Sequence, residues 1–524
     1  MSLSQPADTK HVPTTEPPPH TVAGILCRLG PGLIIAGSIV GSGELIGTTK
    51  TGAQAGFWLL WLILIGCVIK LFAQVELGRY TIVSGATTMQ ALDEVPGPRL
   101  GVNWILWYWL VMFIVGLAQL GGVLGGVAQS MAMSLPITGD FNRLLEEQDA
   151  WDKRAAPVLA RLRGEASLPT TATPAERQSV AQRLKSQLAA QLGVRPAHRT
   201  RDDVYWATLV TLATVLLLVN GRYGLIQHVS MLLVAGFTAV SIFCVIAMQL
   251  QANWAVHMSD LGDGLRFRLP PVTGSGQSSL ATALATFGII GVGANELISY
   301  PYWCLEKGYA RFAGPREASA QWADRARGWL RVMQWDCAVS MVVFTFATVA
   351  FYLLGAAVLH RQGLDPEGNQ MIRTLAEMYV PVFGVWAEWL FLFGAFAVLY
   401  STFFVANAGH ARVAADAVRV FGLGAGTERK RSVWVQVFCT GFPLFALVVY
   451  IFLPTPPTLV LAGGAMQAIM LPMLAVATLY FRYCRSDRRV APGRLWDLGL
   501  WLSAVGLLVA GVSVAIVSLA SWWK

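Results

Sequence analysis

Residues 37–46 of this sequence read GSIVGSGELI, and residues 288–298 read GIIGVGANELI. Both stretches contain a Gly-x-Gly pair followed by Glu-Leu-Ile, although the glutamate stands two residues further from the pair in the second stretch. Glycine weakens a helix, and backbone groups freed inside a membrane are tolerated where they line a cavity. We therefore predict two broken membrane helices at corresponding places in the two halves of the chain, which is typical of secondary transporters.

The surrounding sequence predicts an all-α integral membrane protein. Of the 524 residues, 55% are hydrophobic and 13% are charged, whereas soluble proteins carry about 25% charged residues. Apolar runs of about 20 residues predict roughly eleven transmembrane helices. These runs cover residues 30–50, 57–79, 103–134, 204–221, 225–250, 281–305, 333–358, 382–408, 433–453, 457–481 and 496–520.

Basic residues indicate how the helices are oriented. Lysines and arginines gather in the short loops after the sixth, eighth and tenth runs, at residues 307–331, 412–431 and 482–494. The positive-inside rule then places the N-terminus in the cytoplasm and the C-terminus outside, with the chain in the inner (plasma) membrane. The net charge of +9 is thereby explained without a nucleic-acid partner.

The predicted organisation has four parts. Residues 1–25 are polar and proline-rich, which indicates a disordered cytoplasmic tail. Transmembrane helices 1–3 occupy residues 26–135, and helices 4–11 occupy residues 204–524. Between them, residues 136–203 form a polar extracytoplasmic insert with one helix starting near Asp140 and a second starting at Pro174, with Thr173 as its N-cap. We interpret the insert as a helical hairpin over the outer face, and partner binding is the alternative.

Polar residues inside the apolar runs are the candidate site. Glu44 and Glu296 lead, because an isolated carboxylate is costly within a membrane. Gly41 and Gly293 mark the predicted breaks, whose carbonyls become available as ligands. Asn295 is a further candidate. The alternative is that the glycines serve packing and the glutamates are neutral structural acids.

Three further polar positions are weaker candidates. Gln467, within GGAMQAIMLP, is a candidate ligand or a structural hydrogen bond between helices. Ser401 and Thr402 are candidates for a coupling ion, or their hydroxyls bond back to their own helix. Lys70 is not a candidate, because its long side chain is expected to snorkel towards the cytoplasmic surface.

Several stretches resemble the Nramp (natural resistance-associated macrophage protein) metal transporters. The resemblance rests on GPGLIIAGSIVGSGELIGTTKTGAQAGFWLLW at 30–61, FAQVELGRYTIVSG at 72–85, GRYGLIQHV at 221–229, AGH at 408–410 and MQAIMLP at 466–472. It implies a LeuT-like 5+5 inverted repeat with broken helices 1 and 6 and alternating access. The chain contains no P-loop, GxSxG or HExxH motif, so we expect neither an enzyme nor a resident cofactor.

The chain departs from the family at its metal-binding motifs. The resemblance places the family's Asp-Pro-Gly-Asn on residues 41–44 and its Met-Pro-His-Asn on residues 293–296, so that Gly293 replaces a methionine ligand. A second family histidine falls on Tyr300. A thioether favours transition metals, whereas carboxylates, amides and carbonyls suit hard cations such as Mg²⁺.

These residues support two main hypotheses. The first is transport of a divalent metal, with Mg²⁺ or Mn²⁺ favoured and with Glu44 and Glu296 as charged ligands. The second is a Na⁺- or H⁺-coupled symporter of another small solute, in which Ser401 and Thr402 help to hold Na⁺. A sensor or scaffold that uses the insert is the third. The lipid bilayer and a small ion or solute are the expected partners, and the sequence carries no signal for the oligomeric state.

Overall fold

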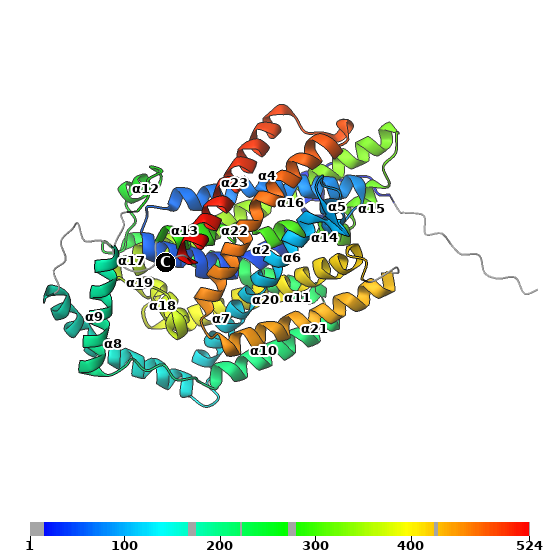
Figure 1. Cartoon of the computed structure of the whole chain (residues 1–524). Helices are drawn as coiled ribbons and strands as arrows, with labels where there is room; N and C mark the ends of the chain where they lie inside the picture. The colour runs from blue at the N-terminus through cyan, green and yellow to red at the C-terminus, as the bar shows by residue number, and fades with distance from the viewer. Residues whose placement is uncertain (1–14, 166–173, 221–222, 271–278, 424–427, 523–524) are drawn as a thin grey trace, which may run out of the picture.

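A computed structural model describes residues 15–165, 174–220, 223–270, 279–423 and 428–522. Long helices pack side by side in a bundle (Figure 1). Within the described residues, nine helical segments are long and apolar enough to span a membrane. They are α2–η1–α3 (Pro31–Ile39, Val40–Thr48, Thr49–Ala55), α4 (Leu60–Ser84), α6–α7 (Trp104–Gly116, Ala118–Ser134), α10 (Asp202–Val219), α16–η3–α17 (Ala320–Leu354, Gly355–Leu359, His360–Gln362), α20 (Ala387–Val420), α21 (Glu428–Phe452), α22–η7 (Pro456–Tyr480, Phe481–Arg485) and α23 (Arg494–Trp522).

The other two predicted spans are helical as well. One is α11 (Tyr223–Ala247), and the other is the interrupted pair α13 (Ser279–Phe287) and α14 (Ala294–Lys307). The prediction of an all-α membrane protein is therefore confirmed, and all eleven predicted runs are helical, nine of them as candidate spans. Short elements join the spans: α1 (Val22–Leu26), α5 (Thr88–Asp93), β1 (Arg99–Leu100), β2 (Val102–Asn103), η2 (Met248–Leu250), α12 (Met258–Gly264), α15 (Tyr309–Ala313), η4 (Gly368–Gln370), α18 (Met371–Ala376), η5 (Glu377–Tyr379), α19 (Val380–Phe383), η6 (Gly384–Trp386) and η8 (Arg488–Val490).

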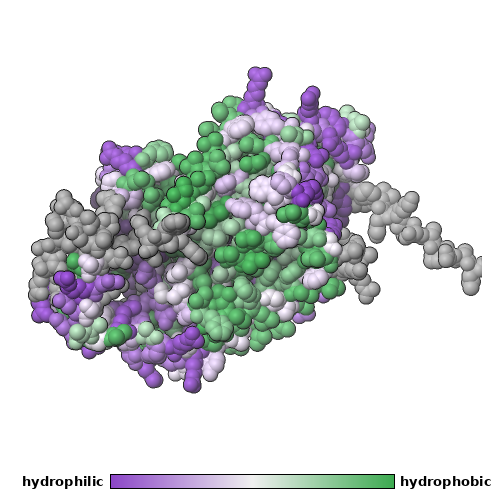
Figure 2. Space-filling model, viewed as in Figure 1, coloured by the Kyte–Doolittle hydropathy of each residue, from purple (hydrophilic) through white to green (hydrophobic). Residues whose placement is uncertain are grey.

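The molecular surface has the polarity of a membrane protein. Figure 2 shows a green hydrophobic band between two ends where hydrophilic side chains gather. Large apolar side chains in the spans face outwards, as at Leu209, Phe346 and Val505, which are 50%, 61% and 54% exposed. Polar residues such as Glu44 and Lys70 are instead fully buried. This arrangement matches a bilayer as the surrounding solvent.

The insert contains the two predicted helices, α8 (Asp140–Glu165) and α9 (Pro174–Leu192), which begin at the predicted residues. They lie at one end of the bundle (Figure 1). Asp202 attaches the insert to the first turn of α10, because its carboxylate accepts backbone N–H bonds from residues 137–139. The predicted N-cap Thr173 lies outside the described residues.

The predicted disordered tail requires a correction. Glu16 donates a backbone hydrogen bond to Phe312 O at 3.2 Å, and its own carbonyl accepts one from Trp329 Nε1 at 3.0 Å. Its carboxylate pairs with Arg28 at 3.1 Å. The prediction of disorder is therefore wrong for residues 15–25, because backbone and aromatic contacts hold this proline-rich segment on α15 and α16. Residues 1–14 lie outside the described residues.

The two predicted breaks take different forms. The sixth span is interrupted between Phe287 and Ala294, where residues 288–293 are not helical. In the first span the α-helix ends at Ile39, and the chain continues as the π-helix η1 over Val40–Thr48. The breaks thus occur where the glycine pairs predict them, but the first span remains wound.

Candidate functional site

The π-helical turn of the first span has an identifiable cause. An α-helix would join Gly41 N–H to Gly37 O, but the Thr402 hydroxyl stands between them. It accepts from Gly41 N at 3.0 Å and donates to Gly37 O at 3.3 Å. A side chain inserted into the helical hydrogen bonds forces such a local change. Only glycine allows this approach, since a Cβ on Gly41 would lie 2.4 Å from Thr402 Oγ1.

Ser401 takes part in the same junction, because its hydroxyl donates to Gly37 O at 3.2 Å. The structure therefore places Ser401 and Thr402 against the carbonyl of the first helix, as the coupling-ion hypothesis requires. It also shows both hydroxyls hydrogen bonded to that helix. Back-bonding to α20 does not describe them.

The broken sixth span is held by a buried lysine. Lys70, on α4, donates from Nζ to Phe287 O and, at 2.8 Å, to Ile290 O. These carbonyls stand at the end of α13 and in the break, where helical partners are missing. The expected snorkelling of Lys70 is therefore wrong: its ammonium group neutralises the negative end of the half-helix.

Glu44 lies on the other side of the same break. Its Oε1 accepts from Gly291 N at 3.1 Å and from Thr348 Oγ1, on α16, at 2.9 Å. Its Oε2 is buried with no hydrogen-bond partner among the described residues. Lys70 interacts electrostatically with Glu44 and also with Glu296. The first predicted carboxylate thus has polar partners on α4, on α16 and in the break of the sixth span.

Glu296 belongs to a second group of polar atoms around Gly293. Its Oε1 accepts from Ser38 Oγ at 3.2 Å. A Cβ atom placed on Gly293 would lie 2.3 Å from Glu296 Oε2 and 2.6 Å from Gln467 Oε1. The carboxylate and amide oxygens therefore border the space that a side chain at position 293 would occupy.

A chain of amides links this group to the neighbouring spans. Gln467 accepts from Asn295 N at 3.1 Å and donates to Gln119 Oε1, on α7, at 2.8 Å. Gln119 in turn donates to Ser42 Oγ at 3.0 Å. Asn295 Oδ1 is buried and has no hydrogen-bond partner among the described residues. It remains available as an oxygen ligand.

The predicted residues are thus brought together in two groups. Glu296, Asn295, Gln467 and Gly293 share one, and Glu44 lies in the other with Lys70. No hydrogen bond joins Glu44 to Glu296, and in the part of the chain that is described no three His, Cys, Asp or Glu side chains are placed to hold a metal ion together. Sequence reasoning missed Ser38, Thr348 and the role of Lys70. For Lys70, the available signal was a charged residue within an otherwise apolar run.

Comparisons with known proteins agree with this fold. The family model for natural resistance-associated macrophage protein-like (Nramp) sequences matches residues 189–522. The crystal structure of the Eremococcus coleocola manganese transporter, in complex with an aromatic bis-isothiourea compound, superposes with a TM-score of 0.61. It is 14% identical, and the match covers 97% of this chain and 90% of that one.

Two curated proteins are similar over shorter stretches. The uncharacterized protein PM0681 of Pasteurella multocida is 27% identical over 252 residues, which are 44% of this chain and 55% of the relative. The divalent metal cation transporter MntH of Mycobacterium tuberculosis strain H37Rv is 32% identical over 111 residues, 21% of this chain and 25% of the relative. The chain thus spans about half of the first and a quarter of the second.

Proposed function

Because the chain belongs to the natural resistance-associated macrophage protein family, whose members are membrane transporters and not enzymes, we propose that it carries a divalent metal cation across the membrane. Mg²⁺ and Mn²⁺ are the favoured ions. MntH and the Eremococcus coleocola protein are named as transporters of a divalent metal and of manganese. Alternating access around the broken sixth span would move the ion.

One observation carries the choice of ion. Oxygen atoms of Glu296 and Gln467 border the space at Gly293, where the family resemblance expects a methionine sulfur. A site without sulfur loses its preference for soft transition metals. Mg²⁺ keeps several waters and is usually bound by one or two carboxylates. The Glu296 carboxylate, together with the side-chain oxygens of Gln467 and Asn295, would therefore supply enough protein ligands for such an ion.

Glu44 would serve as the second carboxylate. Its Oε2 has no partner among the described residues, so this oxygen is free to meet an ion that enters the break. Lys70 competes with that ion for the same negative charge. We propose that Glu44 joins the ion during the transport cycle rather than in the conformation described here.

The symporter alternative is less favoured by the geometry. Ser401 and Thr402 use their hydroxyls to hold Gly37 and Gly41 of the first span. Each hydroxyl oxygen keeps a lone pair that would be open to Na⁺. The contacts with Gly37 and Gly41, however, account for both side chains without an ion.

The test is metal uptake into proteoliposomes that contain a metal-sensitive dye. Wild type is expected to admit Mn²⁺ or Mg²⁺, and Glu296→Gln to lower the rate about tenfold or more, equivalent to about 1.4 kcal/mol of lost charge stabilisation. Glu44→Gln is expected to do the same. Glu306→Gln is the control, because Glu306 is exposed and pairs with Arg412. If folded wild-type protein transports neither Mn²⁺ nor Mg²⁺ into the proteoliposomes, the proposal is wrong.

A further inference from the structure

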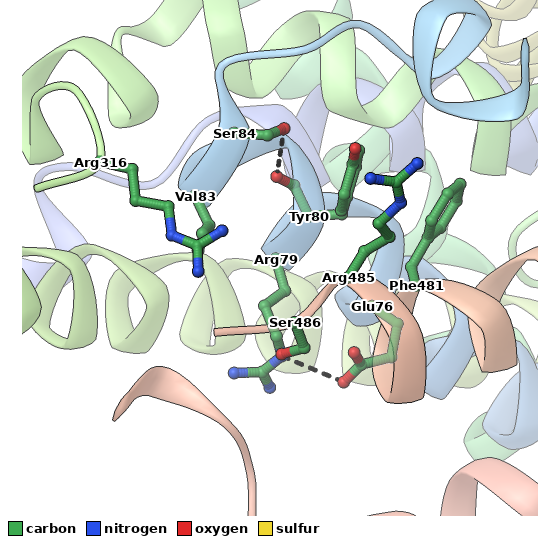
Figure 3. A pocket seen from close by; sticks show the side chains of 9 residues that line it. All are labelled: Glu76, Arg79, Tyr80, Val83, Ser84, Arg316, Phe481, Arg485 and Ser486. Atoms are coloured by element: carbon green, nitrogen blue, oxygen red, sulfur yellow. Dashed lines mark hydrogen bonds and ion pairs between the residues drawn. The ribbon is translucent and has the colours of Figure 1, made fainter. Parts of the chain in front are cut away.

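A second polar cavity lies outside the network of Glu44 and Glu296. It measures about 270 Å³ and is formed by the end of α4, by η7 and by the loop that carries Arg316. Figure 3 shows Arg79, Arg316 and Arg485 around it, with Tyr80 and Ser486. Among its lining residues are three arginines and one carboxylate, that of Glu76. The lining itself therefore carries more positive than negative side chains.

The floor of the cavity holds unused hydrogen-bond donors. Arg79 is 4% exposed, and it donates from Nε to Glu76 Oε1 and from Nη1 to Val490 O, both at 3.1 Å. Its Nη2 and the buried Ser486 Oγ have no partner among the described residues. Buried donors of this kind are rarely left unsatisfied in folded proteins. Two of them in one cavity point to a ligand with several acceptor oxygens.

The mouth of the cavity is basic and more exposed. The side chains of Arg316 and Arg485 are 54% and 44% exposed. They pair with Asp487 at 2.9 Å and with Glu94 at 3.3 Å. The Arg489 side chain, hydrogen bonded to Asp487, holds the pKa of that carboxyl well below its ordinary value. Both arginines are therefore held near the opening and retain N–H groups for a ligand.

The cavity also lies beside surface that suits lipid. On the neighbouring α23, Trp501 donates from Nε1 to Tyr483 OH at 2.9 Å. Leu498 and Leu502 on the same helix are 60% and 63% exposed. Tryptophan and tyrosine collect where hydrocarbon meets headgroups. Tyr483 precedes Arg485 by two residues, so this surface adjoins the residues at the mouth of the cavity.

We propose that this cavity binds a phosphate group, supplied either by an anionic phospholipid headgroup or by free phosphate. Arg79 Nη2 and Ser486 Oγ donate to it from the floor, and Arg316 and Arg485 neutralise it at the mouth. Arginine binds phosphate through paired, charge-assisted hydrogen bonds, and basic pockets between membrane helices are suited to lipid headgroups. The site is independent of the transported ion.

The test uses the full-length protein and two probes. Native mass spectrometry follows phosphatidylglycerol and phosphatidylcholine retained after extraction from mixed vesicles, and thermal unfolding is measured with potassium phosphate against potassium chloride of equal ionic strength. Ser486→Ala, and Arg316→Gln combined with Arg485→Gln, are each expected to weaken binding about tenfold. The control, Arg488→Gln combined with Arg494→Gln, removes two exposed arginines outside the cavity.

Each outcome decides the proposal. Preferential retention of phosphatidylglycerol that the cavity variants lose identifies a lipid headgroup as the source. Stabilisation by phosphate that the cavity variants lose, without lipid preference, identifies the free ion. The loss is required because phosphate also stabilises folded proteins non-specifically. No response to either probe, a response that the cavity variants keep, or an equal loss in the control variant overturns the proposal. Metal uptake is expected to persist in Ser486→Ala, which keeps this test separate from that of the transported ion.

Discussion

The carboxylate of Glu296 stands where a longer side chain at position 293 would have to go. The two residues are therefore coupled, because a Cβ on Gly293 would approach Glu296 Oε2 to 2.3 Å. A thioether at 293 would therefore require the Glu296 carboxylate to turn away from its present position.

Exchanging both residues together is expected to change ion preference. Gly293→Met combined with Glu296→Asn supplies sulfur and removes the carboxylate, so uptake is expected to shift from Mg²⁺ towards Cd²⁺. Gly293→Met alone is expected to lose uptake, because its side chain meets Glu296. Competition between the two metals in proteoliposomes measures the shift. An unchanged preference in the double variant contradicts the assignment of this site.

Lys70 is expected to be essential for stability. Lys70→Met leaves the carbonyls of Phe287 and Ile290 without their donor, at about 1–3 kcal/mol for each buried group. Thermal unfolding in detergent should show a lower midpoint for this variant, and Lys70→Arg should lose less. Lys153→Met, on the exposed side of α8, is the control. A midpoint equal to that of wild type would show that the ammonium group is dispensable.

At the scale of the elements, the two breaks differ because their surroundings differ. The sixth span opens and Lys70 replaces its missing partners, whereas in the first span the Thr402 hydroxyl bridges Gly41 N and Gly37 O and the chain continues as a π-helix. A close backbone contact with α22 fixes the position of the break in the sixth span. A Cβ on Gly288 would lie 1.9 Å from Gly464 O of α22, which is too close for any side chain.

Gly288→Ala is therefore expected to destabilise the protein by at least about 1–3 kcal/mol, because backbone must shift to admit the methyl group. Gly441→Ala, in α21, is the matched control, since no neighbouring element among the described residues lies within 4 Å of the place its methyl group would take. Alanine favours a helix over glycine, so the control should be neutral or slightly stabilising. Equal unfolding midpoints for the two variants would refute the close contact.

Apolar runs and glycine spacing were sufficient for the spans and both breaks, and helix-start residues were sufficient for the starts of α8 and α9. They were insufficient where a contact joins distant parts of the chain. Lys70 meets Phe287, 217 positions later, and Thr402 meets Gly41 across 361 positions. An apolar run containing a lysine predicts snorkelling unless these partners are known. The packing of residues 15–25 could not be predicted either, because its partners Phe312 and Trp329 are distant in the sequence.

At the scale of the whole molecule, contacts gather the basic loops at one end. Arg316 pairs with Asp487, and Arg489 donates to Ser319 O at 3.2 Å, which joins the loops at 307–331 and 482–494. In Figure 1 the insert helices α8 and α9 lie at the other end of the bundle. The positive-inside rule therefore predicts that the insert faces outwards.

Cysteine labelling of intact cells tests this orientation. Glu146→Cys, on the exposed side of α8, is expected to react with a membrane-impermeant maleimide in a background where Cys27 and Cys484 are serine. Wild-type Cys484, exposed beside the basic loop, should react only after the membrane is permeabilised. The reverse pattern would invert the proposed topology.

The buried lysine has an electrical consequence. With Glu44 and Glu296 ionised, Lys70 leaves one net negative charge around the break when the carrier is empty, and a divalent ion makes it one net positive charge. Each charge that crosses the membrane field contributes about 2.3 kcal/mol per 100 mV. An inside-negative voltage would then draw the loaded site inwards and push the empty site back, so that one lysine would make both half-cycles of uptake electrogenic.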